Sequence, residues 1–209
     1  MRAGWVERVA GIDVVTERAE VLRRLMPVHR IEAERQVGSA HWWRAEQVHG
    51  NELAVVPGAA TCEGEDGEPV VPGVDGLLCA EPGEVLGIYV ADCGAIWLAD
   101  RRLGAVGLLH SGKKGTEGEI LVRAVARMKE AFGCEPEDLV AVLSPCIRPP
   151  HYEVDIAAEI GRQAVAAGIG SYFDCWCDTA ADRERYYSYR MEKGQTGRML
   201  ALIRCGGSA

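Results

Sequence analysis

The chain has 209 residues, of which 48% are hydrophobic and 26% charged, and it carries a formal net charge of -8 at pH 7. This composition suffices for one domain with a sizeable core, and the acidic balance argues against nucleic acid or an anionic membrane as a partner. Eight cysteines without an N-terminal signal pattern predict reduced thiols in the cytoplasm, and no apolar run approaches the roughly 20 residues of a membrane span.

The N-terminal third predicts one helix and one short strand. Residues 16–26, TERAEVLRRLM, place apolar side chains at helical spacing behind Thr16, and Pro27 is expected to end the helix. NELAVV at 51–56 predicts a strand. The following segment, 57–73, is rich in Gly, Pro and acidic residues and is expected to be a solvated loop.

From residue 74 the chain becomes a series of apolar runs separated by turn residues. These runs are VDGLLCA, VLGIYVAD, AIWLAD and LGAVGLLH. Nearly continuous apolar strands are typical of sheets covered on both faces, so helices or a second sheet must pack on them.

The remainder alternates predicted helices and strands. Residues 117–132 have one apolar helical face, and Thr116 with Glu119 forms a capping-box pattern, so a helix is expected to begin at Thr116 with its free N–H groups facing the SGKKG loop. LVAVLS and TGRMLALIRC predict strands, and a further helix is expected at 155–167. One α+β domain spanning 1–209 accounts for the whole pattern.

Three candidate metal ligands stand at predicted strand ends: His49, Cys93 and His110. One thiolate and two imidazoles suit zinc and leave a fourth tetrahedral position open for water or substrate. Their spacing is long and irregular, so no local motif forces them together. The alternative is that Cys93 is a small buried residue and that each histidine is an ordinary core or loop residue.

Five ordered motifs resemble the bacterial multicopper polyphenol oxidoreductase (laccase-domain) family. They are QVHGNELAVV, VDGLLCAEPGEVLGIYVADCGAIWLAD, LGAVGLLHSGKKGT, SPCIRPPHYEVD and YYSYRMEKGQTGRMLALI. The resemblance covers about residues 45–204, whereas 1–44 match only loosely. It implies a four-layer α/β/β/α fold with mixed sheets, and a metal site formed by His49, Cys93 and His110.

The segment after His110 departs from the family pattern. Where the family usually reads HAGWRG, this chain has HSGKKG, so a tryptophan and an arginine are replaced by Lys113 and Lys114. Lysine offers a point charge rather than a planar fork. The two lysines, two glycines and the expected helix N-terminus predict an anion-binding turn.

Four other residues are weighed as site residues. Asp92, beside Cys93, is a candidate for proton transfer or ligand orientation, with a turn-forming role as the alternative. Arg190, by its place in the family motif, is a candidate for binding an anionic substrate. Cys175 and Cys177 are expected on one side of a strand in a structural role, because two cysteines alone make half a metal site.

The resemblance implies three functional hypotheses. The first is a zinc-dependent purine nucleoside phosphorylase, adenosine deaminase or both, with a purine nucleoside and phosphate as small-molecule partners. The second is copper-dependent polyphenol oxidation, although five histidines are few for a four-copper site. The third is a metal-bound, non-catalytic interaction protein. Neither nucleic acid nor membrane is expected as a partner, and the oligomeric state is left open.

Overall fold

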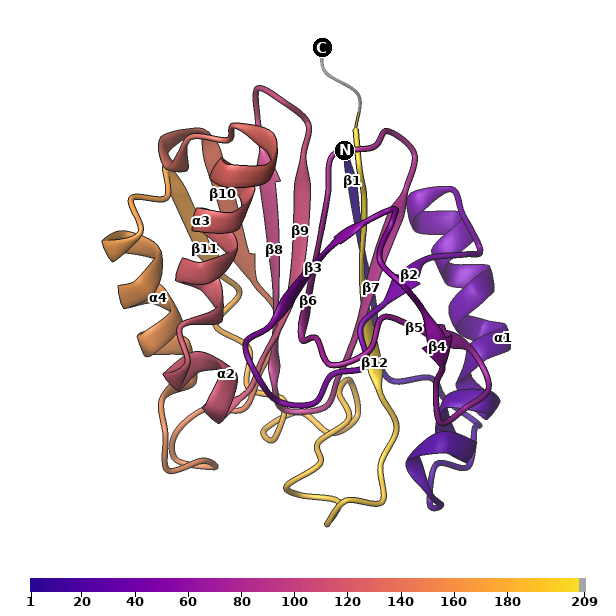
Figure 1. Cartoon of the computed structure of the whole chain (residues 1–209). Coiled ribbons are helices and arrows are strands. Elements are labelled where there is room, and N and C mark those ends of the chain that lie inside the picture. The colour runs from indigo at the N-terminus through magenta and orange to yellow at the C-terminus, as the bar shows by residue number, and fades with distance from the viewer. Residues whose placement is uncertain (207–209) are drawn as a thin grey trace.

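The computed structural model describes residues 1–206, and its helices lie on the two outer sides of a pair of sheets (Figure 1). The helices are α1 (Arg18–Val37), α2 (Lys113–Glu117), α3 (Ile120–Phe132), α4 (Ile156–Ala166) and a 3-10 turn, η1 (Pro136–Asp138). No helix within 1–206 has both the length and the apolar character needed to cross a membrane.

Two mixed sheets form the middle of the molecule. In spatial order, the four-stranded sheet contains β1 (Arg2–Val6), β12 (Met199–Arg204), β7 (Val85–Val90) and β2 (Trp43–Arg44). The six-stranded sheet contains β11 (Ser171–Asp174), β10 (Leu139–Leu143), β8 (Gly94–Asp100), β9 (Val106–Ser111), β6 (Gly76–Cys79) and β3 (Leu53–Val56). β4 (Cys62–Glu63) and β5 (Pro69–Val70) form a small separate hairpin.

Three apolar cores separate four layers. Strand β7 is apolar along its whole length because both of its faces are buried. Leu86 and Ile88 pack in the core between the sheets, whereas Val85 and Tyr89 pack in the core beneath α1. The third core packs α3 and α4 on the outer face of the six-stranded sheet. In Figure 1 the order from left to right is α2–α4, the six-stranded sheet, the four-stranded sheet and α1. The predicted four-layer α/β/β/α fold is confirmed.

The predicted end of the first helix at Pro27 is wrong. Helix α1 continues through Pro27 to Val37 and ends at Gly38, which has φ 72°. Pro27 lies on the exposed face of α1, where water can satisfy the carbonyl group that the proline ring leaves without an N–H donor. Tertiary packing of the buried face, which includes Leu25 and His29, outweighs the local helix-breaking tendency.

The predicted helix start at Thr116 is also wrong. Lys113 and Lys114 lie inside the short helix α2, and α3 begins at Ile120 after Glu119, whose φ is 57°. The Thr116 hydroxyl does not cap a helix, because it is buried and lies 2.8 Å from the Ser111 hydroxyl. The rest of α2 and the turn at Gly118 and Glu119 therefore separate the two lysines from the N-terminus of the long helix, and that part of the anion-turn hypothesis is lost.

The four central strands and the helix near 155–167 are found, whereas three edge strands were not predicted. β1, β2 and β11 each lie at the edge of a sheet, where one side of the strand stays open and the apolar pattern is weak. Cys175 and Cys177 follow β11 rather than lying on a strand, and Trp176 between them has φ 59°. The predicted strand alternation of the two thiols is wrong.

Candidate metal centre

His49, Cys93 and His110 lie together in one cluster. His49 comes from the loop between β2 and β3, Cys93 from the turn between β7 and β8, and His110 from the end of β9. Their candidate ligand atoms all lie within 4.8 Å of one another, and the imidazole centroids are 4.8 Å apart. His110 is buried, Cys93 is half-buried and His49 is exposed, so the cluster opens toward solvent on the His49 side.

Asp75 holds two of these residues in place. Its Oδ1 lies 2.8 Å from His110 Nδ1 and accepts the His49 backbone N–H at 2.9 Å, while Oδ2 accepts the Gly50 N–H at 2.7 Å. The Asp75 carbonyl also accepts the His110 backbone N–H at 2.7 Å. With Nδ1 engaged, Nε2 of His110 is the nitrogen left for a metal, which is the usual carboxylate–histidine–metal arrangement.

Gln47 fixes the loop that carries His49. Its side-chain amide donates to the Tyr89 carbonyl at 2.6 Å and accepts the Tyr89 N–H at 2.9 Å, so the loop is tied to β7. Gln47 and His49 have φ values of 64° and 62°, a left-handed conformation that side chains other than glycine adopt at a cost. The two hydrogen bonds between Gln47 and Tyr89, and those that the Asp75 carboxylate accepts from His49 and Gly50, maintain this conformation.

Gly112 leaves room for the Cys93 sulfur. A Cβ atom at this position would lie 2.7 Å from Cys93 Sγ and 3.8 Å from His49 Cδ2. The φ of Gly112 is -93°, which other residues can adopt, so space rather than backbone freedom requires glycine here. The backbone of the turn after β9 therefore lies so close to the Cys93 sulfur that no side chain fits between them.

Cys93 and His110 form an ion pair in the metal-free protein. Burial alone would raise the pKa of the Cys93 thiol, but the charge of His110 and hydrogen bonds from both histidines outweigh burial and lower it to about 6. Burial alone would lower the pKa of His110, but the Cys93 thiolate and Asp75 outweigh it and raise it to about 9. Between these values the site holds a thiolate and an imidazolium.

This donor set fits a metal ion. One thiolate and two imidazoles are good ligands for zinc, and the deprotonated sulfur is the form that binds. Metal must displace the proton from His110, so metal affinity is expected to rise with pH until the pH reaches the pKa of His110. Among residues 1–206 no other group of three His, Cys, Asp or Glu side chains is arranged to hold a metal.

Both carboxylate oxygens of Asp92 have hydrogen-bond partners within the chain. Its two carboxylate oxygens accept the Thr179 hydroxyl and the Arg190 backbone N–H, each at 2.7 Å. Its carbonyl accepts the Ile147 N–H at 2.8 Å, and its φ is 79°. These contacts anchor the chain segments around Cys93, and the role of Asp92 in proton transfer or ligand orientation stays a prediction.

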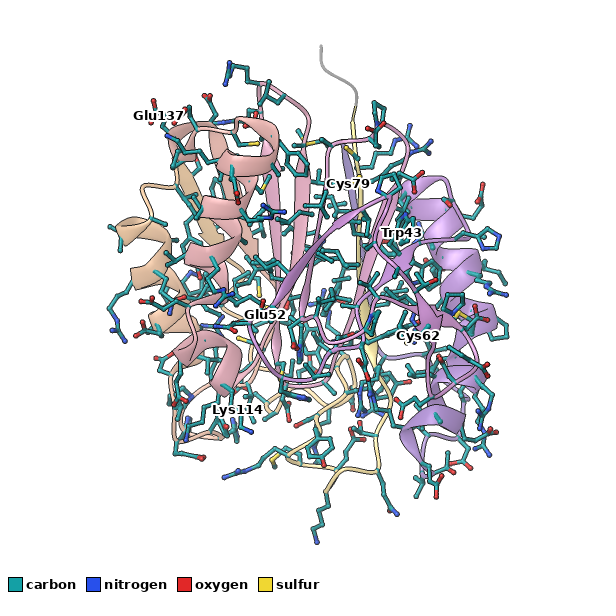
Figure 2. The ribbon with its side chains drawn as sticks, in the orientation of Figure 1. Trp43, Glu52, Cys62, Cys79, Lys114 and Glu137 are labelled. Atoms are coloured by element: carbon teal, nitrogen blue, oxygen red, sulfur yellow. The ribbon has the colours of Figure 1, made fainter. Side chains whose placement is uncertain are left out.

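The candidate anion-binding side chains are exposed. Figure 2 shows Lys114 at the lower edge of the molecule on α2, and Lys113 directly follows Gly112. Neither lysine forms an ion pair within the described part of the chain. The Arg190 guanidinium lies 3.2 Å from Glu153 and 5.4 Å from the Tyr152 ring centroid, so its charge is partly neutralised.

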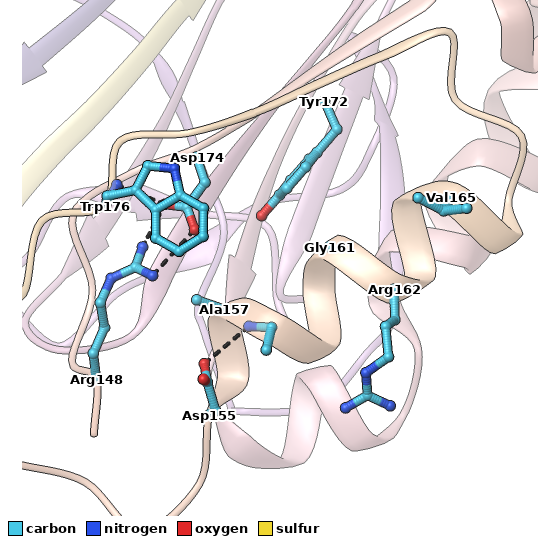
Figure 3. Close-up of a pocket in the computed structure, with 10 residues that line it drawn as sticks. Arg148, Asp155, Ala157, Gly161, Arg162, Val165, Tyr172, Asp174 and Trp176 are labelled. Carbon is cyan, nitrogen blue, oxygen red and sulfur yellow. Dashed lines mark hydrogen bonds and ion pairs between the residues drawn. The ribbon is translucent and has the colours of Figure 1, made fainter. Parts of the chain in front are cut away.

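A hollow of about 450 Å³ lies between α4 and β11 and is separate from the cluster (Figure 3). Arg148 and Asp174 form an ion pair at one end of it, with the exposed Trp176 ring 5.6 Å from the guanidinium. Cys175 and Cys177 are neighbours in sequence of Trp176, which lines the hollow. His151 Nδ1 lies 2.7 Å from the Asp178 carboxylate. His49, Cys93 and His110 do not line the hollow.

Asp75 and Gln47 were missed as site residues by reasoning from sequence, whereas Gly112 was expected in the anion-binding turn but not beside the Cys93 sulfur. Asp75 carried a signal, because an aspartate directly before the buried strand GLLC must find hydrogen-bond donors if it is buried. Gln47 had no such signal, because its contact with Tyr89 joins segments 42 residues apart.

Comparison with known proteins assigns the family. The family described as multi-copper polyphenol oxidoreductase laccase matches residues 13–165 and 154–206. The chain therefore belongs to this family, and the resemblance stated from the five motifs is confirmed. The match also includes most of the N-terminal region that resembled the family only loosely.

Several relatives carry the name purine nucleoside phosphorylase. The protein from Deinococcus radiodurans is 34% identical over an alignment of 189 positions that covers 77% of this chain and 68% of that protein. YlmD from Geobacillus stearothermophilus is 30% identical over an alignment of 230 positions that covers 92% of this chain and 81% of YlmD. The crystal structure of YlmD superposes with a TM-score of 0.80 over 98% of this chain and 91% of that chain, at 25% identity. Bacillus licheniformis YfiH shares the fold with a TM-score of 0.78 at 22% identity, over 91% of this chain and 83% of that chain.

Asp75→Asn is expected to lower the affinity for Zn²⁺ by about 10–100-fold, the usual effect of removing a carboxylate behind a metal-ligating histidine. Asparagine keeps the shape but loses the charge that orients three N–H donors. Calorimetric titration of the metal-free protein measures this. Asp100→Asn is the matched control, because Asp100 is equally buried but accepts the backbone N–H groups of Arg102 and Leu103 at the far end of β8. Equal zinc affinity in Asp75→Asn and the wild type would contradict the positioning role.

Cys93 in the metal-free protein is expected to react with iodoacetamide as its thiolate forms, with a midpoint near pH 6. Cys175 is the internal control, because partial desolvation and the neighbouring Cys177 and Asp174 raise its pKa to about 11, although its side chain is exposed. Peptide mapping by mass spectrometry after alkylation at a series of pH values gives both rates. A Cys93 midpoint at about 8.5, the value of a free thiol, contradicts the ion pair with His110.

Proposed function

We propose that this chain is a purine nucleoside phosphorylase that holds a zinc ion on His49, Cys93 and His110. The observation that carries the proposal is the convergence of these three side chains into a cluster that opens to solvent on the His49 side. The relatives named purine nucleoside phosphorylase, among them those from Deinococcus radiodurans and Geobacillus stearothermophilus, support the choice of reaction.

Zinc is favoured over copper by the number of ligands. Oxidation of phenols by several copper ions requires further histidines around the first site. The described residues provide one cluster of three ligands and no second one. A single closed-shell ion with three protein ligands and one open position needs no more than this cluster.

The proposed reaction exchanges one bond at the sugar. A phosphate oxygen forms a bond to C1′ of the ribose while the bond from C1′ to the purine nitrogen breaks. The base leaves with the bonding electrons and gains a proton, which yields a free purine and ribose 1-phosphate. Zinc, when bound, supplies a Lewis acid that polarises an oxygen or nitrogen of the reactants.

The chain's own residues provide orientation and charge. Asp75 holds His110 with Nε2 directed to the cluster, and Gln47 holds the exposed His49 at its entrance. Lys113 and Lys114, next to Gly112, are proposed to attract the anionic phosphate. Asp92 fixes the backbone of Arg190, whose side chain is proposed to contact the substrate at the rim.

The same donor set suits hydrolytic deamination of adenosine, in which water replaces the exocyclic amine and ammonia leaves. The sequence resemblance implies this activity as well, and it shares the metal ligands with phosphorolysis. Release of ammonia and release of free base are chemically distinct, so one set of assays measures both.

Zinc-loaded wild type is expected to release free purine from adenosine, inosine or guanosine only when phosphate is present, with one ribose 1-phosphate per base. Chromatography with and without phosphate measures the base, and a coupled assay measures ammonia. Base release without phosphate, or oxidation of a phenol by the copper-loaded protein in place of phosphorolysis, contradicts the proposal.

Cys93→Ser is expected to lose bound zinc and at least about 100-fold in activity, since it removes the thiolate ligand. Cys175→Ser and Cys177→Ser are matched controls, because both thiols lie outside the cluster. Elemental analysis of the three purified variants tests the assignment, and equal loss of zinc in all three would show that the cluster does not hold the metal.

A further inference from the structure

Arg198 is a buried cation without a carboxylate partner. It is 9% exposed, and its Nη1 donates to the carbonyl groups of Thr196 at 3.0 Å and Gly197 at 2.8 Å. No Asp or Glu within residues 1–206 forms an ion pair with it. The other buried arginine, Arg44, is paired with Asp66 at 2.9 Å. Burying a guanidinium without a counter-charge is costly, which points to an anion from outside the chain.

The strand pairing places Arg198 at the same end of β7 and β12 as the turn that carries Cys93. Arg198 directly precedes β12, and the first residue of β12, Met199, faces Val90, the last residue of β7. Cys93 lies three residues beyond Val90, so both residues occupy the same end of this strand pair. Burial lowers the pKa of Arg198, the nearby positive charge of Arg18 lowers it further, and the Cys93 thiolate acts in the opposite direction.

The loop before Arg198 is held firmly. Glu192 accepts the Ser188 backbone N–H at 3.0 Å and the Thr196 hydroxyl at 2.5 Å, and it pairs with Arg8 at 2.6 Å. The two carbonyl contacts occupy Nη1 of Arg198. A preorganised guanidinium loses little entropy when it binds an anion, and its planar fork matches two phosphate oxygens.

We propose that Arg198 binds the phosphate co-substrate beside the His49–Cys93–His110 cluster. This inference rests on the proposed phosphorylase function and names the side chain that recognises its second substrate. The exposed Lys113 and Lys114 attract phosphate from solution, whereas Arg198 holds it where solvent screening is weak. The anion in turn supplies the counter-charge that Arg198 lacks.

The test compares Arg198→Gln and Arg198→Lys with the wild type in phosphorolysis at varied phosphate and saturating nucleoside. Arg198→Gln is expected to raise KM for phosphate by about 10–100-fold, the range for loss of charge-assisted hydrogen bonds. Arg198→Lys keeps the positive charge but loses the planar guanidinium, so its KM for phosphate is expected to lie between those of the wild type and Arg198→Gln. KM for the nucleoside and zinc content should stay near the wild-type values.

Arg44→Gln is the matched control, because it removes a buried arginine that already has a partner. It is expected to lower the melting temperature without changing KM for phosphate. Melting temperatures of the Arg198 variants with and without phosphate identify any general loss of folding. Phosphorolysis by Arg198→Gln with the wild-type KM for phosphate overturns the inference and leaves the proposed function standing.

Direct binding separates the two proposals if the wild type shows no phosphorolysis, an outcome that refutes the function. Calorimetric titration of the zinc-loaded protein with inorganic phosphate, without nucleoside, then decides the role of Arg198. Binding to the wild type that is lost in Arg198→Gln supports the anion site. Equal binding by both proteins, or binding by neither, overturns it.

Discussion

The candidate metal centre depends on the carboxylate of Asp75. This one group accepts hydrogen bonds from the imidazole of His110 and from the backbone of His49 and Gly50, so it joins β6, β9 and the loop before β3. Burial would raise the pKa of the Asp75 carboxyl, but these donors outweigh burial and hold it below the usual value. The carboxylate therefore stays charged, and its charge in turn stabilises an imidazolium at His110 when no metal is bound.

The layered fold brings the three candidate ligands together from separate segments. Strands β7 and β9 belong to different sheets that pack face to face, and their ends at one edge of the molecule carry Cys93 and His110. The loop with His49 reaches the same edge because Gln47 ties it to β7. A left-handed His49 and an absent side chain at Gly112 then allow the sulfur and the imidazoles to approach. The site thus combines rigid strand ends with locally strained loops, which are tolerated because many hydrogen bonds determine them.

The sequence predicts the central strands because these depend on strong, local patterns, whereas the four-layer order is implied by the family resemblance. Long apolar runs such as VLGIYV require cover on both faces, and that requirement alone indicates sheets packed between other layers. The boundaries that failed depend on tertiary contacts. Thr116 has the pattern of a helix cap, but a buried hydroxyl contact with Ser111 decides its place instead. The three candidate ligands are identified by family motifs. The role of Asp75 depends on His110, which is distant in sequence, and that of Arg198 depends on its burial without a carboxylate partner, so neither role can be predicted from the local sequence.

The net charge of -8 determines where an anionic substrate can be recognised. An acidic protein repels phosphate at long range, and at physiological ionic strength this field is screened beyond about 8 Å. Recognition must therefore rest on cations within the site itself. The charges of exposed lysines such as Lys113 and Lys114 are screened by water and mobile ions, so each contributes little to the affinity for phosphate. A buried guanidinium is screened much less, and its fork selects oxygens in a plane. The replacement of the family's arginine by lysine after His110 is therefore compatible with phosphate binding, provided that a buried arginine such as Arg198 faces the same space.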